Sequence, residues 1–238
     1  SASNNFPYFA GESLTTGTNF YITMCQTELN AHETPYVYSG GTTGSRSDTA
    51  SLIDLKKTRD INVSNVSFDS DSQPEFDGTD DFIPVNNLLA SQAIGATTQL
   101  TISMWLNPDT HSDDMAFSTG QSGNDRIYHW TTNGVNTWRV NGYTSTTGHG
   151  TLPAIGNWYN TVLVLDGLSI RVYLNGVEDY TASYTAFTTE HYATFGRHGA
   201  SSSYYYNGKI AVARIHDEAM SAEEIKSNFN AYKNRFNL

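Results

Sequence analysis

The chain has few cysteines, few positive charges and no long apolar runs. Its 238 residues include one cysteine, Cys25, so no internal disulfide can form, and an extracellular domain would have to be stable without that cross-link. Lysine and arginine number 13 against 24 aspartates and glutamates, which gives a formal net charge of −11. Such a surface repels nucleic-acid phosphates and anionic lipid headgroups, so we expect no nucleic-acid or membrane partner.

Signals for membrane insertion and export are also lacking. No apolar run approaches the roughly 20 residues that a membrane-spanning helix needs. The first residues, SASNNFPYFAG, have neither the basic nor the apolar region of a signal peptide. We expect either that a signal peptide has been removed or that export does not use one.

Aromatic residues and hairpin dipeptides, in contrast, are abundant. Aromatics make up 13% of the chain, with 15 tyrosines, a composition suited to strands and to surfaces that stack on sugars. Asn-Gly and Asp-Gly favour the primed turns that close hairpins. They occur at 77–78, 133–134, 141–142, 166–167, 175–176 and 207–208. Many short strands joined by such turns are typical of a β-sandwich.

Three segments between the turns have the pattern of strands. Aliphatic residues or methionine recur at every second position over 100–106 and over 168–174, which predicts strands with one buried face. Residues 161–165 (TVLVL) are apolar on both parities. This pattern predicts a central strand that is covered on both faces.

One amphipathic helix is predicted near the C-terminus, over 222–234. Ser221 is a suitable N-cap, and Glu224 three residues later completes a capping box. Met220 and Ile225 occupy the two positions of a hydrophobic staple. Apolar residues then recur four and seven positions after Ile225, which gives the helix one apolar stripe.

Residues 1–50 differ from the rest of the chain because they are rich in Ser, Thr, Gly and Asn. We predict an N-terminal arm and lead-in over 1–50, followed by one sandwich domain over 51–238. The arm has several apolar anchors and is expected to lie against a sheet edge of its own or a neighbouring subunit. The residues leave open that 20–25 is simply an extra strand of the same sandwich.

Four segments, in order, resemble the signature of laminin-G-like (concanavalin A-like) jelly-roll domains. The first, 51–54 with PEFDGTDDFI at 74–83, is similar to D-L…F-D-G-x-x-D-Y, and TISMWLNP at 101–108 is similar to F-T-I-S-x-W-V-K-P. The segment 156–177 (GNWYNTVLVLDGLSIRVYLNGV) is similar to W-H-H-V-A-V-T-Y-D-G…L-Y-V-N-G, and 208–225 to G-K-I…R-I…L-S-x-E-E-I. The resemblance implies an all-β, two-sheet antiparallel jelly-roll sandwich with a short C-terminal α-helix. Asn160 and Met220 depart from the family pattern.

A narrower resemblance concerns the end of the chain. The closing NFNAYKNRF at 228–236 is similar to the N-Y-N-A-L-K-G-R-F/Y tail of such domains in tailed-phage virion proteins, especially marine ones. This implies a non-enzymatic capsid decoration or tail structural protein, located on the virion, with other virion proteins as partners and homo-oligomers on the particle. Its lectin-like fold could bind host glycans. The alternative is a secreted, extracellular bacterial carbohydrate-binding or adhesion module.

A third class, a polysaccharide-degrading enzyme of the same fold, is disfavoured by the carboxylates. Retaining hydrolysis needs two carboxyl groups about 5 Å apart, which this fold supplies as Glu-x-Asp-x-x-Glu along a strand. The nearest segment begins at Glu75 but has Asp80 at its last position, and the turn dipeptide Asp77-Gly78 interrupts it. We therefore expect no catalytic residues and no enzyme activity.

The same acidic turn is a candidate calcium site. Asp77, Asp80 and Asp81 lie close together in sequence, and Asp217 follows the last predicted strand. Ca²⁺ prefers several carboxylate and carbonyl oxygens, and the family resemblance, since many relatives carry such an ion, implies a structural Ca²⁺ here. The alternative is that aspartates occur here because they suit tight turns.

Aromatic residues in or beside hairpin loops are candidates for carbohydrate binding, because their faces stack on sugar rings. They are Trp130, Trp138, Tyr143, Tyr204, Tyr205 and Tyr206. For the two tryptophans, a place in the core or at a subunit contact is the alternative. At least one of the three consecutive tyrosines should be exposed, because neighbouring strand residues point to opposite faces. His149 and His198, in glycine-rich segments, are expected to be solvated.

Overall fold

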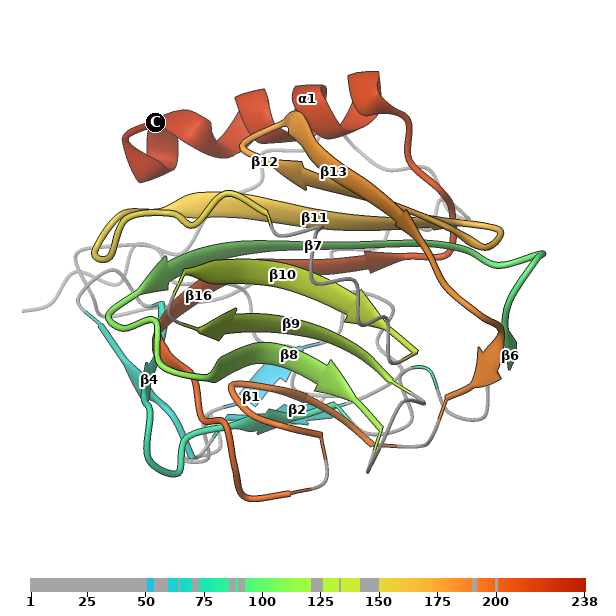
Figure 1. The fold of residues 1–238 in the computed structure, drawn as a ribbon. Coiled ribbons are helices and arrows are strands. Elements are labelled where there is room, and N and C mark those ends of the chain that lie inside the picture. Colours follow the sequence, from blue (N-terminus) through green and yellow to red (C-terminus); the bar gives the residue numbers. More distant parts are fainter. Residues whose placement is uncertain are drawn as a thin grey trace, which may run out of the picture. The chain divides into compact units, whose positions relative to one another are not determined.

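Two antiparallel β-sheets face each other across one apolar core in the computed structural model (Figure 1). The structure describes residues 51–53, 60–63, 65–69, 73–85, 89, 93–120, 126–132, 134–141, 150–189, 192–199 and 201–238. The predicted arm at 1–50 lies outside these residues and stays a prediction. The fold is the two-sheet jelly roll with a short C-terminal helix that the sequence predicts.

The larger sheet has the strand order β13-β12-β11-β7-β16-β4-β3. Its strands are β3 (Ser67–Phe68), β4 (Pro74–Asp77), β7 (Gln99–Pro108), β11 (Tyr159–Asp166), β12 (Ser169–Leu174), β13 (Val177–Ser183) and β16 (Asn207–His216). All of its neighbouring strands are antiparallel.

The smaller sheet has the order β10-β9-β8-β15-β5. Its strands are β5 (Ile83–Pro84), β8 (Asp114–Thr119), β9 (Ile127–Thr132), β10 (Val135–Val140) and β15 (Ala193–Phe195). Two short pairs complete the described strands: β1 (Ser51–Ile53) with β2 (Asp60–Asn62), and β6 (Ala93–Ile94) with β14 (Phe187–Thr188).

Strand β11 is covered on both faces, as its sequence predicts. Leu163 and Leu165 point into the core between the sheets, whereas Val162 and Val164 belong to a second apolar cluster on the opposite face. Each buried aliphatic side chain contributes roughly 1.5–3 kcal/mol relative to an exposed one. The seven-stranded sheet is therefore the middle layer of the domain.

The helix that covers this second face is α1 (Ala222–Tyr232), and Figure 1 shows it above β11 and β12. The capping box is confirmed: the Glu224 N–H donates to Ser221 Oγ, and the Ser221 N–H donates to the Glu224 carboxylate at 2.8 Å. The staple residues Met220 and Ile225 are both buried in the second cluster. No helix in the described part of the chain is long and apolar enough to cross a membrane.

The helix ends earlier than the sequence predicts, because its last turn tightens into the 3₁₀-helix η1 (Lys233–Phe236). This turn places Phe236 against Trp105 of β7, with ring centroids 4.2 Å apart, and Phe229 of α1 stacks on Trp105 at 5.6 Å. Stacked aromatic pairs add about 0.5–1.5 kcal/mol beyond the area they bury. Trp105 thus anchors the helical layer to the sheet.

The hairpin prediction is confirmed at 175–176 and wrong at 207–208. Asn175 and Gly176 both have positive φ, +51° and +76°, and connect β12 to β13. In contrast, Asn207 and Gly208 are the first two residues of β16: both pair with β4, and Gly208 also pairs with Pro108 of β7. A side chain at Gly208 would place a Cβ 2.3 Å from the carbonyl oxygen of Asn107, so glycine here permits close packing of strands.

Buried His129 of β9 makes stability depend on pH. Its ring is fully buried beside Trp138, and burial lowers its pKa to about 4, against about 6.5 in an unfolded chain. Between these two pH values His129 is protonated in the unfolded chain but not in the folded protein. The free energy of unfolding should therefore fall as the pH drops from 6.5 to 4. For one such group the loss is about 1.4 kcal/mol per pH unit.

We expect the variant His129→Phe to lose stability less steeply over this pH range, as measured by urea unfolding at several pH values. Above pH 7, where the histidine is neutral in both states, the two proteins should have parallel profiles. Equal slopes for the two proteins between pH 6.5 and 4 would contradict this account of His129.

Candidate functional site

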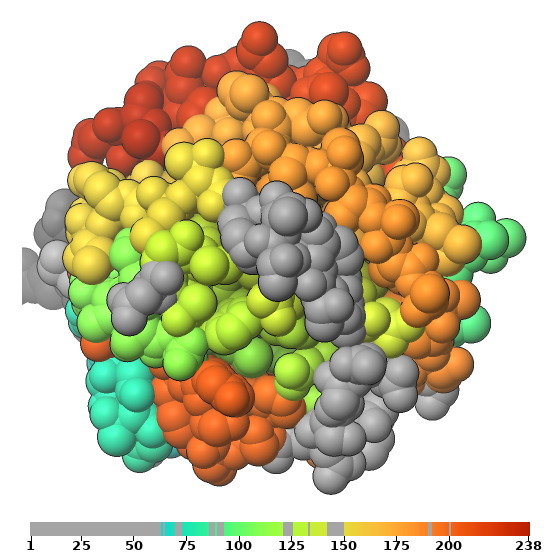
Figure 2. All heavy atoms as spheres, in the orientation of Figure 1, coloured from blue at the N-terminus to red at the C-terminus, as the bar shows by residue number. Residues whose placement is uncertain are grey.

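An open depression of about 300 Å³ lies where three segments meet at one end of the sandwich. These segments are the turn after β4, the loop from β7 to β8 and the residues around the start of β16. Eight residues line it: Gly78, Thr110, Ser112, Asp113, Asp114, Tyr204, Tyr205 and Asn207. In Figure 2, the orange surface of the segment before β16 lies beside the teal β4–β5 region and the green β8 region.

Backbone hydrogen bonds fix these segments to one another. The Asp109 N–H donates to the Asn207 carbonyl at 3.0 Å, and the Met115 N–H donates to the Tyr204 carbonyl at 3.0 Å. The first bond continues the β16–β7 pairing beyond the regular ladder, and the second ties the segment before β16 to β8. Backbone pairing therefore holds the walls of the depression in place without a ligand.

Asp114 supplies the most buried polar group of the depression, with 3% of the residue exposed. Its Oδ2 accepts hydrogen bonds from Thr110 Oγ1 at 2.9 Å and from the Ser112 N–H at 3.2 Å. Burial raises the pKa of this carboxyl, and the two hydrogen bonds oppose the rise. Neighbouring hydroxyls and carboxylates of this kind can exchange hydrogen bonds with the hydroxyls of a sugar.

Of the three consecutive tyrosines, Tyr204 and Tyr205 line the depression and Tyr206 does not. Tyr204 is 45% exposed, which confirms that at least one of the three faces solvent. Tyr206 is fully buried and packs edge-on against Phe76 at 6.1 Å. The prediction that Tyr206 contacts a ligand is wrong, because its ring is part of the core.

The two candidate tryptophans lie elsewhere. Trp138 is 1% exposed, and its Nε1 donates across the core to Thr161 Oγ1 at 2.8 Å. Its assignment to a carbohydrate site is wrong, and the core alternative is correct. Trp130 is partly exposed on β9, but the Arg139 guanidinium lies over its ring at 4.4 Å. Tyr143 lies outside the described residues.

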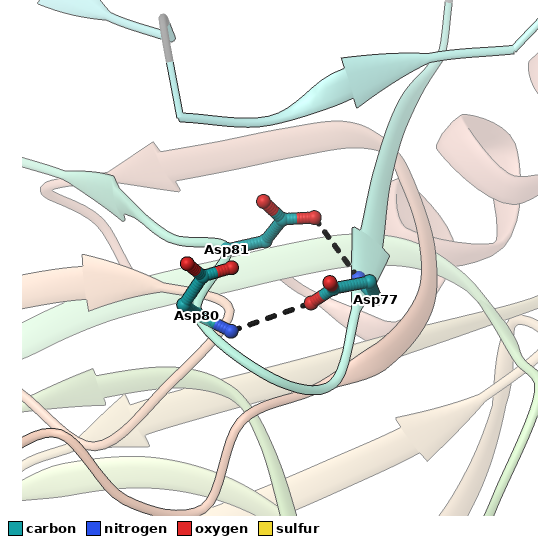
Figure 3. A group of neighbouring side chains, drawn as sticks. All are labelled: Asp77, Asp80 and Asp81. Carbon is teal, nitrogen blue, oxygen red and sulfur yellow. Dashed lines mark hydrogen bonds between the residues drawn. The ribbon is translucent and has the colours of Figure 1, made fainter.

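The three neighbouring aspartates of the β4–β5 turn converge, as Figure 3 shows. Asp77, Asp80 and Asp81 each offer a carboxylate oxygen, and these oxygens lie within 4.8 Å of one another. Asp77 Oδ1 accepts the Thr79 N–H at 2.7 Å, and Asp81 Oδ2 accepts the Asp77 N–H at 3.0 Å. Burial and the neighbouring Asp77 and Asp80 carboxylates raise the pKa of Asp81, although the Asp77 N–H opposes the rise.

Asp217 is not part of this cluster. It follows the end of β16, whereas Asp77 pairs with Asn207 at the beginning of that strand. A strand of this length separates the two ends by on the order of 30 Å. Asp217 therefore cannot share an ion with the three turn aspartates, since it lies at the opposite end of the sandwich, and the calcium site at those three stays a prediction.

His198 is buried, not solvated as the sequence suggests, with 6% of the residue exposed. The Arg126 guanidinium contacts its Nε2, and its ring centroid is 6.2 Å from that of Tyr204. The charges of Arg126 and Arg197 both act on this buried ring, and sequence analysis missed both arginines. It also missed Thr110, Ser112, Asp113 and Asp114, although the polar run between two strand patterns could have indicated a loop.

The sequence and the fold identify the family. The family described as the concanavalin A-like lectin/glucanases superfamily (Laminin_G_3) matches residues 77–226. The chain belongs to this family. The matched segment contains the acidic turn, the β7–β8 loop and Tyr204, so the depression lies within the family domain.

Solved structures with the same fold include both binding domains and an enzyme. The binding domain of Paraclostridial Mosquitocidal Protein 1 has a TM-score of 0.59 and 16% identity, over 76% of this chain and 50% of that chain. Domain 4 of AbnA, an extracellular GH43 arabinanase from Geobacillus stearothermophilus solved with arabinotriose, has a TM-score of 0.51 and 18% identity, over 70% and 80%. A Trypanosoma rangeli sialidase in complex with 2,3-difluorosialic acid has a TM-score of 0.58 and 13% identity, over 77% and 31%.

This chain thus spans half of the mosquitocidal binding domain and less than a third of the sialidase. At these identities the likeness concerns the fold, which is lectin-like. The comparison with curated proteins finds no match.

Proposed function

We propose that this domain binds carbohydrate without cleaving it, and that the sugar rests on Tyr204 in the depression. The observation that carries the proposal is the exposed Tyr204 ring beside hydroxyl and carboxylate groups in a preformed concave site. Sugar sites combine an aromatic face with a few placed polar groups in this way. The arabinotriose-bound domain with the same fold supports the idea.

The carboxylates support binding without catalysis. Asp77 Oδ1 accepts backbone N–H groups of Thr79 and Asp80, so this carboxylate stabilises its own turn. Glu75 Oε1 lies 3.9 Å from Lys209 Nζ on the neighbouring strand. Asp80 lies in the turn after β4, so it does not continue the spacing of Glu75 and Asp77 along one strand. Glycoside hydrolysis is the second candidate function, because a sialidase has a similar fold.

We further propose that the acidic turn holds a structural Ca²⁺. Asp77, Asp80 and Asp81 supply the hard oxygen ligands that Ca²⁺ takes. A cation there would also offset the mutual repulsion that helps to raise the pKa of Asp81. The turn adjoins the depression, since Gly78 lines it and Asp77 pairs with Asn207.

As for its location, we propose that the domain decorates a virion, on capsid or tail, as a homo-oligomer among other virion proteins. The net charge of −11 and the phage-like ending at 228–236 support this. Residues 1–50 would act as the docking arm. A weak contact per subunit gains strength when it is repeated over a particle surface. The alternative, a secreted bacterial carbohydrate-binding module, shares the same ligand chemistry.

Removing the Tyr204 ring should weaken glycan binding. We expect Tyr204→Ala to raise the Kd for a glycan identified on an array by roughly tenfold, or about 1.4 kcal/mol, as measured by calorimetry. Val177→Ala removes another exposed apolar side chain, on β13, and should leave the Kd unchanged. Unaltered affinity in Tyr204→Ala would refute this site. Release of reducing sugar by the wild type, abolished in Glu75→Gln, would favour the enzyme instead.

Calcium should raise the melting temperature through the acidic turn. Calcium at a hundredfold excess over its Kd should stabilise the folded domain by about 2.7 kcal/mol. For a chain of this size, this raises the melting temperature by on the order of 5–10 °C. Asp81→Asn should lose most of this rise. In chelator the same variant should be at least as stable as wild type at pH 7, because the raised pKa means that the ionised Asp81 destabilises the folded state.

Asp217→Asn is the matched control for this experiment, because Asp217 lies far from the turn and its loss should leave the calcium response intact. Melting curves of the wild-type protein that coincide in calcium and in chelator would remove the calcium site from consideration.

Deleting residues 1–16 should separate the docking arm from an intramolecular strand. We expect a folded domain, judged by circular dichroism, that no longer co-sediments with phage particles lacking this protein. A truncated chain that co-sediments as well as the full chain would contradict the arm. One that fails to fold would favour an added strand in its own sandwich.

A further inference from the structure

The loop after β15 folds back over the outer face of the five-stranded sheet. Phe195 of β15 packs into the core, so Thr194 points to the outer face, where its hydroxyl donates to the Arg197 carbonyl at 3.0 Å. Gly199 then packs on the backbone of Gly120, where an added Cβ would lie 2.3 Å from the carbonyl oxygen. This close approach buries the side chain of His198 against the sheet.

The hydrogen bonds of His198 define where its proton lies. An Arg126 Nη1–H donates to Nε2 of the ring, so Nε2 must be an acceptor. Burial, together with the charges of Arg126 and Arg197, lowers the pKa of His198 to about 4, so the ring is neutral near pH 7. Its single proton is therefore on Nδ1. This buried N–H has no hydrogen-bond partner among the described residues, a state that destabilises the folded protein.

The two guanidinium groups beside His198 are also incompletely paired. Arg126 lies over the ring of Tyr128 at 4.4 Å, and Arg197 lies over the ring of Phe82 at 3.6 Å. Their Nε atoms are buried and lack hydrogen-bond partners within the described part of the chain. The ion pairs found there involve Arg171 and Lys209, not these two arginines.

Among the described residues, two arginines without an ion-pair partner thus lie next to a donor without an acceptor, in a chain of net charge −11. All three groups can only donate hydrogen bonds, so the group that would satisfy them is an acceptor with negative charge. Guanidinium groups match the planar oxygens of carboxylates, sulfates and phosphates. The site adjoins the depression, because the His198 ring is 6.2 Å from that of Tyr204.

We propose that Arg126, Arg197 and the Nδ1–H of His198 form an anion subsite for the carboxylate or sulfate group of an acidic saccharide. This inference rests on the proposed function, because the sugar ring of the same ligand would lie on Tyr204. Neutral saccharides would contact the depression alone, whereas acidic saccharides would also contact the anion subsite. The domain would therefore bind acidic saccharides more tightly. The carboxylate or sulfate would accept the hydrogen bonds for which the described residues supply no acceptor.

The test follows the ring signals of His198 by NMR during titration with monosaccharides. Galacturonic acid supplies a carboxylate, galactose 6-sulfate supplies a sulfate, and galactose is the neutral match. We expect saturable shifts of the His198 nitrogens with at least one acidic sugar and none with galactose. The two acidic arms identify which anion the subsite prefers.

Variants assign the effect to the arginines. Arg126→Gln and Arg197→Gln should each raise the Kd of the acidic sugar at least tenfold, whereas Arg126→Lys should recover part of the loss. Arg126→Lys also serves if Arg126→Gln fails to fold. Arg171→Gln removes an arginine of the other sheet that pairs with Asp166 at 3.5 Å, and it should bind like wild type.

Absence of any His198 response to both acidic sugars, or a response that survives loss of both arginines, would overturn the subsite. Binding of neutral glycans through Tyr204 would then still stand. Conversely, a glycan array without any ligand would overturn the proposed function, while the His198 response to the two acidic monosaccharides would still decide whether the anion subsite exists.

Discussion

The pairing of β16 with β7 is the constraint on which both ends of the domain depend. Its ladder runs from Gly208 opposite Pro108 to His216 opposite Thr101. At its beginning, the pairing continues into the hydrogen bond from the Asp109 N–H to the Asn207 carbonyl, next to the point where Met115 of β8 bonds to Tyr204, and these contacts form the depression. Slippage of this register by one residue would turn every side chain of β16 to the opposite face, and the loops of the depression would no longer meet.

At its other end, the same strand delivers the chain to the helix. Thr101 Oγ1 donates to the Glu218 carbonyl at 2.7 Å and accepts the Met220 N–H at 3.0 Å, immediately before the N-cap of α1. The helix then covers the outer face of β11 and stacks on Trp105. The helical layer therefore stabilises the middle sheet.

Charge is distributed unevenly over this frame. The acidic turn gathers three carboxylates, whereas Arg126 and Arg197 lie around buried His198 on the outer side of the smaller sheet. Tyr204 lines the depression that Gly78 of the acidic turn also lines, and its ring neighbours His198. The saccharide proposed to lie on Tyr204 would thus be close to both a cationic group and an acidic turn.

The sequence by itself determined the features that depend on short-range pattern. The capping box of Ser221 and Glu224, the hairpin at 175–176 and the doubly covered strand at 161–165 follow from local spacing, because neighbours along the chain create each of them. The order of family motifs also predicted the jelly roll.

Only the tertiary structure decided which aromatic and polar residues form the site. In the sequence, Trp138 and Tyr206 are aromatic residues in or beside predicted hairpin loops, just as Tyr204 is. In the fold, however, the side chains of Trp138 and Tyr206 point into the core. The dipeptide Asn207-Gly208 predicts a hairpin turn, but in the fold β16 starts at this dipeptide and lies between β4 and β7. Arg126 and His198 are 72 residues apart. Their contact depends on the order of β9, β8 and β15 in the smaller sheet, which a pattern of neighbouring residues in the sequence cannot predict.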